Sequence, residues 1–166
     1  MNKPTMNEQL DKVLDAFDQK QHERKQVQNE TRSREDAFLA QFSTFRTIVA
    51  HPLFEQVGNH LRSRGHDFDI SQQDYELQHD GKTRDASISL NIYPSGVERN
   101  LSSGHGMPHF SVIASRSSRT VRLHGSNMMP GHGGSAGGRG EFKLEQLTNE
   151  ILQKELVSLL AEVFTK

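Results

Sequence analysis

Histidine is the side chain best suited to do chemistry in this sequence, and four of its nine histidines lie in the second half of the chain around residues 105–132. These candidates are His105, His109, His124 and His132. Converging imidazoles can bind zinc or another transition metal, or one of them can act as a general base. If the segments on either side of Ser117-Ser118 pair as strands, His109 and His124 reach the same end of that hairpin. The sequence therefore predicts a histidine cluster, with a metal site as one interpretation.

A glycine-rich segment adjoins these histidines, because seven of the thirteen glycines fall between Gly125 and Gly140. Residues 97–140 carry five arginines and one glutamate, a net formal charge of +4. Glycine amides can form a concave anion site, and guanidinium groups bind phosphate or carboxylate well. The residues that we expect to bind an anion are Arg116, Arg119, Arg122, Arg139, Gly133, Gly134, Gly137 and Gly138. The alternatives for this segment are a flexible connector and a mobile cover or partner-docking loop.

Motifs for enzymatic chemistry are incomplete. Gly133 to Gly140 has the glycine spacing of a phosphate-binding loop, but no Ser or Thr follows to hold magnesium, and no helix opens directly from it. The chain has no cysteine, and none of its serines lies in a G-x-S-x-G elbow. We therefore expect a protein that is not an enzyme and that uses no cofactor.

Alternation of apolar and polar residues predicts the elements that position these side chains. Ala86, Ile88, Leu90 and Ile92 alternate with polar neighbours, which is typical of a strand covered on one face only. The predicted strands are 68–77, 86–93, 109–115 and 119–125. A short helix precedes them and ends near Gly65, and a C-terminal helix begins after Thr148. The predicted fold is α+β, with a four-stranded antiparallel meander sheet packed by the C-terminal helix and the short helix.

The first fifty residues predict a long N-terminal helical arm. Thr5 and Glu8 form a capping box, and His51-Pro52 should kink or restart the helix. One heptad seam runs through Leu10, Leu14, Phe17, Gln21, Arg24, Gln28, Thr31, Glu35, Phe38, Phe42, Phe45 and Val49. Because residues 18–36 are almost wholly polar, the arm either pairs with a second copy or a partner, or contains a flexible linker. The predicted domains are the arm, 1–50, and an α+β domain, 51–166, with a glycine-rich loop at 125–140.

Composition limits the partners and the compartment. The 166 residues have a formal net charge of −1 and a mean hydropathy of −0.73, so no global field favours nucleic acid. No stretch approaches the roughly 20 apolar residues of a membrane span, and the N-terminus lacks the apolar core of a signal peptide. We expect a cytoplasmic protein with no membrane or nucleic-acid partner.

These observations favour a non-enzymatic interaction protein. It would self-associate or bind a protein partner through residues 5–50, and it would bind an anionic group at the basic, glycine-rich edge of the sheet. One alternative is a histidine-based metalloprotein or hydrolase that uses the 125–140 loop as a lid. Another is a weak nucleic-acid binder that uses its arginines.

Overall fold

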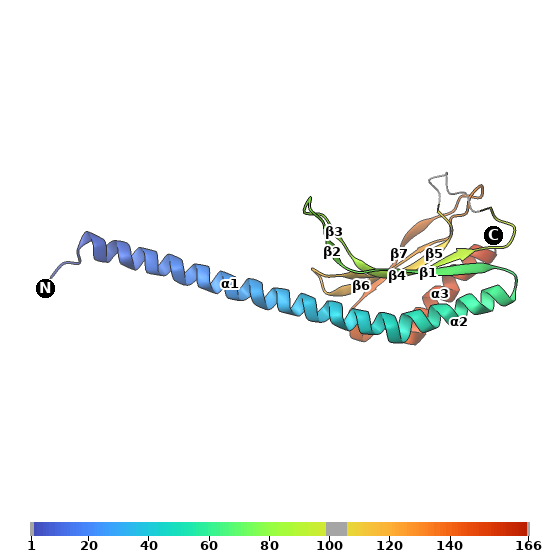
Figure 1. Ribbon diagram of the computed structural model, residues 1–166, viewed down its shortest axis with the longest axis horizontal. Coiled ribbons are helices and arrows are strands. Elements are labelled where there is room, and N and C mark those ends of the chain that lie inside the picture. The colour runs from blue at the N-terminus through green and yellow to red at the C-terminus, as the bar shows by residue number, and fades with distance from the viewer. Residues whose placement is uncertain (1, 99–105, 166) are drawn as a thin grey trace. The chain divides into compact units, whose positions relative to one another are not determined.

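The computed structural model describes residues 2–98 and 106–165, and the α+β class is confirmed (Figure 1). The helices are α1 (Met6–Phe45), the π-helix η1 (Arg46–Ala50), α2 (His51–Ser63), the 3₁₀-helix η2 (Leu144–Gln146) and α3 (Asn149–Phe164). The strands are β1 (Asp67–Gln73), β2 (Glu76–Leu77), β3 (Thr83–Arg84), β4 (Ala86–Tyr93), β5 (His109–Ser115), β6 (Thr120–Ser126) and β7 (Ala136–Phe142). The chain divides into two compact units, Met1–Ala37 and Phe38–Lys166, and the second is called the sheet-bearing unit below. The unit that carries the sheet therefore begins inside α1, ahead of the boundary predicted at residue 51.

Helix α1 begins at the predicted capping box. The Glu8 amide donates to Thr5 Oγ1 at 3.2 Å, and the Thr5 amide donates to Glu8 Oε2 at 3.0 Å. This reciprocal pair satisfies two of the amides that a helix start leaves without intrahelical acceptors. The polar residues 18–36 are helical throughout, which agrees with the continuous-helix alternative and not with a flexible linker.

Pro52 neither ends the helix nor restarts it, because a π-helical turn precedes it. Pro52 has no amide to donate to Ile48, and its ring crowds that carbonyl. In η1 the His51 amide instead bonds the Arg46 carbonyl, five residues back. This wider turn lets the chain stay helical to Ser63, where Gly65, with φ of 92°, makes the predicted stop.

The main sheet has five antiparallel strands in the order β1-β4-β5-β6-β7, so the prediction of four strands is wrong. The missed strand is β7, which begins inside the glycine-rich loop predicted at 125–140 and runs two residues past it. Its sequence, AGGRGEF, has almost no residues that favour strands, and its ladder with β6 holds it extended. Asp80-Gly81 lies in the turn of a small separate ribbon formed by β2 and β3.

Helices α2 and α3 cover one face of this sheet (Figure 1). That face carries the alternate apolar residues of the central strands, such as Leu90, Phe110 and Leu123, which are fully buried. From α3, Leu152, Leu156 and Leu159 are equally buried against them. The opposite face carries polar residues, among them Ser89 and Ser111, whose hydroxyls lie 2.7 Å apart.

Candidate functional site

His109 and His124 meet on the polar face of the sheet, as the sequence predicts. The β5–β6 register pairs Ser111 with His124 and His109 with Ser126, so the two imidazoles are diagonal neighbours. Their rings stack with centroids 5.6 Å apart and planes 18° from parallel. His109 Nδ1 also lies 3.2 Å from the Met107 carbonyl oxygen, which orients that ring.

The surroundings of His124 disfavour its charged form. Partial burial lowers the pKa of His124 from its ordinary 6.5, and the nearby positive charges of His109, Arg122 and Arg139 lower the pKa further. His124 is therefore a neutral hydrogen-bonding group at neutral pH, and it adds no positive charge to the sheet face.

The His124→Gln variant should lose part of the dependence of stability on acid. Because the pKa of His124 is lowered by folding, the unfolded chain takes up this proton at a higher pH than the folded chain. This contribution to stability is complete above about pH 6.5 and is lost as the pH falls toward the folded pKa. The free energy of unfolding, measured with denaturant at several pH values between 5 and 8, should change less with pH in His124→Gln. It should also change less in His109→Gln, which removes one of the nearby charges that lower the pKa of His124. An unchanged slope in His124→Gln would contradict this assignment.

The predicted metal site is not assembled in the described residues. His109 and His124 lie face to face rather than converging on one point, and His132 is exposed in the turn after β6. His105 lies outside the described residues. Across residues 2–98 and 106–165, no group of three or more His, Asp or Glu side chains is placed to hold a metal ion.

The four predicted anion-binding arginines are dispersed. Arg122 pairs with Asp85 at 3.5 Å, and the Arg116 guanidinium lies over the Tyr75 ring, 5.0 Å from its centroid. Arg119 is in the turn between β5 and β6, with a left-handed φ of 54°. Arg139 forms an ion pair with Glu162 of α3. Two of the four, Arg122 and Arg139, lie near enough to His124 to lower its pKa, and Arg122 shares the polar face with it.

A β-bulge turns Arg139 away from that face. The β6–β7 register pairs Leu123 with Gly140 and His124 with Gly138, which makes Arg139 the extra residue. Its side chain crosses Gly125, where an added Cβ would lie only 2.5 Å from Arg139 Nε. Gly125 is thus needed for this close approach.

Glu162 of α3 binds both Arg139 and the loop that joins β6 to β7, and the sequence did not predict this role. It accepts from Arg139, and it accepts from the Asn127 amide group at 2.9 Å. Asn127 in turn accepts from the Ser135 amide at 2.8 Å, which closes the loop between β6 and β7. The only sequence signal was a carboxylate beside the apolar residues Leu159 and Val163 of the C-terminal helix.

The predicted glycine nest is divided between a strand and a loop. Gly137 and Gly138 belong to β7, whereas Gly133 and Gly134 lie in the preceding loop with φ of 66° and 138°. Gly138 and Gly140 instead line a depression of about 380 Å³ above β6 and β7, together with Arg122 and His124. Glu141 also lines it and accepts from Thr120 at 2.6 Å. With His124 neutral, Arg122 and Glu141 nearly cancel, so the depression has little net positive charge.

The strongest exposed apolar feature lies at the start of α1. Five large side chains lie on one side of that helix at spacings of three and four residues. We call them the N-terminal stripe: Met6, Leu10, Val13, Leu14 and Phe17. Their exposed fractions run from 49% at Leu10 to 72% at Met6, which is high for so many neighbouring apolar residues.

The two ends of the heptad seam differ in burial in the structure. Its C-terminal members Phe38 and Phe42 are buried in the core of the sheet-bearing unit. Its N-terminal members Leu10, Leu14 and Phe17 stay exposed. Within the seam, the first turns of α1 therefore offer apolar surface to another molecule.

The fold and these sites define an α+β chain that carries a capped amphipathic helix and a polar sheet face. No protein-family model, no curated protein and no solved structure matches it. In the described part of the chain, no helix combines the length and apolar character needed to cross a membrane.

Proposed function

We propose that this protein acts by association, and that the N-terminal stripe of α1 binds a second copy of the chain. The exposure of the stripe is the observation that carries the proposal. Burying one Leu or Phe side chain stabilises a complex by about 1.5–3 kcal/mol, and the stripe offers five large apolar side chains. Helices of this kind gain most of their stability from packing of the apolar side rather than from propensity.

Anion binding at the glycine-rich edge stays a prediction with narrower support. Arg122 beside the depression is the observation in its favour, and Asp85 and Glu141 close by weaken the local positive charge. The cytoplasmic location likewise stays a prediction from the sequence.

The double variant Leu10→Gln/Phe17→Gln tests the association. Glutamine has a helix propensity close to that of leucine, so the change removes apolar surface with little effect on the helix at position 10. Losing about 3 kcal/mol of burial should weaken self-association about a hundredfold. Light scattering at a fixed concentration should then show a lower molar mass for the variant than for the unmodified chain.

Lys12→Gln is the matched control, because residue 12 lies on the side of the helix opposite the stripe. It should associate like the unmodified chain. Equal molar masses for all three proteins would show that the stripe does not mediate association.

A further inference from the structure

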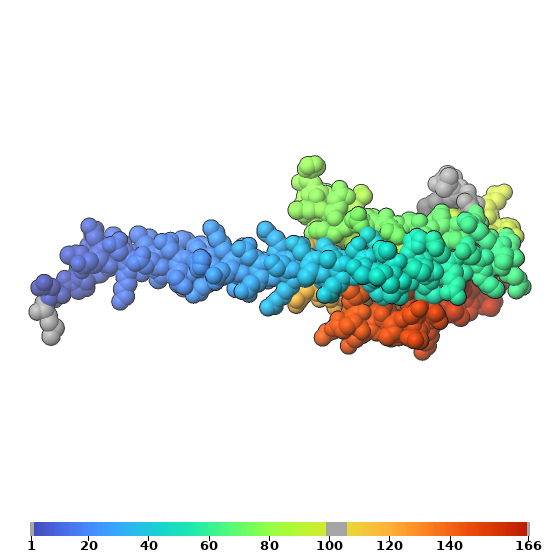
Figure 2. Space-filling model, turned by 60° about the horizontal axis from the view of Figure 1, so that its bottom comes forward, coloured from blue at the N-terminus to red at the C-terminus, as the bar shows by residue number. Residues whose placement is uncertain are grey.

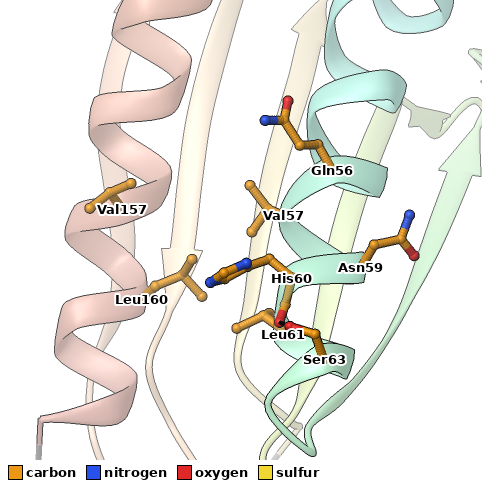
Figure 3. Close-up of a pocket in the computed structure, with 8 residues that line it drawn as sticks. All are labelled: Gln56, Val57, Asn59, His60, Leu61, Ser63, Val157 and Leu160. Atoms are coloured by element: carbon orange, nitrogen blue, oxygen red, sulfur yellow. Dashed lines mark hydrogen bonds between the residues drawn. The ribbon is translucent and has the colours of Figure 1, made fainter.

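A groove between α2 and α3 is an exposed apolar feature of the sheet-bearing unit (Figure 3). It has a volume of about 550 Å³, and Val57 and Leu61 of α2 line it together with Val157 and Leu160 of α3. His60 and Leu160 point toward one another across it (Figure 3). Val157 is 61% exposed, although it lies in a helix that packs on the core.

We infer that this groove receives the N-terminal stripe of a second copy, an inference that rests on the proposed function above. Helices α2 and α3 lie side by side on the surface of their unit (Figure 2), and two neighbouring helices form a furrow into which a third can pack. Amphipathic helices bind such grooves through apolar anchors spaced by three and four residues. Leu10, Val13 and Phe17 have this spacing.

Charge favours the groove over pairing of two stripes. Residues 6–18 carry four acidic side chains and Lys12, a net formal charge of −3. Two such segments packed in parallel would bring like charges together, which disfavours association. The groove is lined by no acidic side chain, it contains His60, and Arg64 follows the end of α2.

Antiparallel pairing of two α1 helices matches charge but not apolar surface. Residues 19–34 carry five basic and two acidic side chains, so they complement the acidic start of the helix. Val27 is the only large apolar residue in that range, so the stripe would face mostly polar side chains. Of these three arrangements, the groove is the one that offers the stripe both apolar contacts and compatible charge.

Cross-linking between two single-cysteine variants tests this inference, because the chain has no cysteine of its own. Leu10→Cys and Val157→Cys change exposed positions, and each variant has one reactive thiol. With a short bismaleimide, a product of twice the chain mass should form in the mixture of the two variants and not in either alone. A dimer product from Leu10→Cys alone would show that stripes pair with each other and would overturn the groove assignment.

Val157→Glu provides a second arm, since it places a negative charge where the acidic helix should bind. It should weaken self-association by at least about tenfold, as expected for the loss of a central contact. Ser158→Glu adds the same charge on an exposed side of α3 away from the groove and should associate normally. If the unmodified chain associates but neither the mixed cross-link nor the Val157→Glu effect is found, the groove inference is wrong while the proposed function stands. A chain that is monomeric throughout contradicts both.

Discussion

Arg46→Met is expected to lower the free energy of unfolding by about 3 kcal/mol, because the Arg46 guanidinium of η1 binds backbone carbonyls where β1 and β4 pair at one end of the sheet. The side chain is 10% exposed, and its Nη1 donates to the Gln73 carbonyl at 2.9 Å and to the Ser87 carbonyl at 3.3 Å. Methionine fills similar volume but removes both of these part-buried hydrogen bonds, and a hydrogen bond to a charged group contributes about 1.5–3 kcal/mol.

Asp74→Asn separates this effect from that of the ion pair. Arg46 Nη2 also donates to Asp74 Oδ1 at 2.6 Å, but the Asp74 side chain is 86% exposed. An ion pair with one exposed partner contributes about 1 kcal/mol or less. Denaturant unfolding should therefore show a much smaller loss for Asp74→Asn than for Arg46→Met. Equal losses would mean that the ion pair, and not the two carbonyl contacts, is the main contribution.

Gly58→Ala is expected to destabilise the protein by about 1–3 kcal/mol, although alanine normally stabilises a helix interior by about 1 kcal/mol relative to glycine. A Cβ at position 58 would lie 2.4 Å from two ring carbons of Phe68. Phe68 of β1 is buried in the core against α2, so its ring cannot move aside without disturbing its neighbours. The crowding should outweigh the gain in helix propensity.

Asn59→Ala is the control for Gly58→Ala. Asn59 is an exposed neighbour in the same helix, so its replacement should raise the melting temperature slightly or leave it unchanged. Thermal unfolding followed by circular dichroism compares the two variants. A melting temperature for Gly58→Ala at or above that of the unmodified chain would contradict the close packing of α2 on β1.

Local signals in the sequence predicted most of the elements. The capping box at Thr5, the stop at Gly65 and the cap at Thr148 depend on residues within a few positions of one another, and hydrogen bonds of the structure match each of them. The alternation from Ala86 to Ile92 predicted a strand with one buried face, and that face is buried. Such features need no knowledge of distant contacts.

The missed features depend on contacts between distant segments. β7 is extended because it pairs with β6, and its glycines carry no pattern of their own. The sequence also gave no sign that Arg139 would be a bulged residue, so its pairing with Glu162 could not be predicted. By contrast, the meeting of His109 and His124 followed from pairing two strands about one tight turn, which places the two histidines two positions apart in register.

The heptad seam was informative but incomplete for a related reason. Periodicity predicts which side of a helix is apolar, but not which molecule covers it. Phe38 and Phe42 are covered by the chain's own core, whereas the side chains of the stripe remain exposed. The sequence alone treated both ends of the seam as one surface.

Sedimentation velocity of the unmodified chain over a dilution series tests the central claim most directly. The account predicts a species of twice the 18.8 kDa chain mass that gives way to the single chain as the protein is diluted. A single species of 18.8 kDa at every concentration up to about 100 μM, which is about 100 times a micromolar dissociation constant, would contradict it.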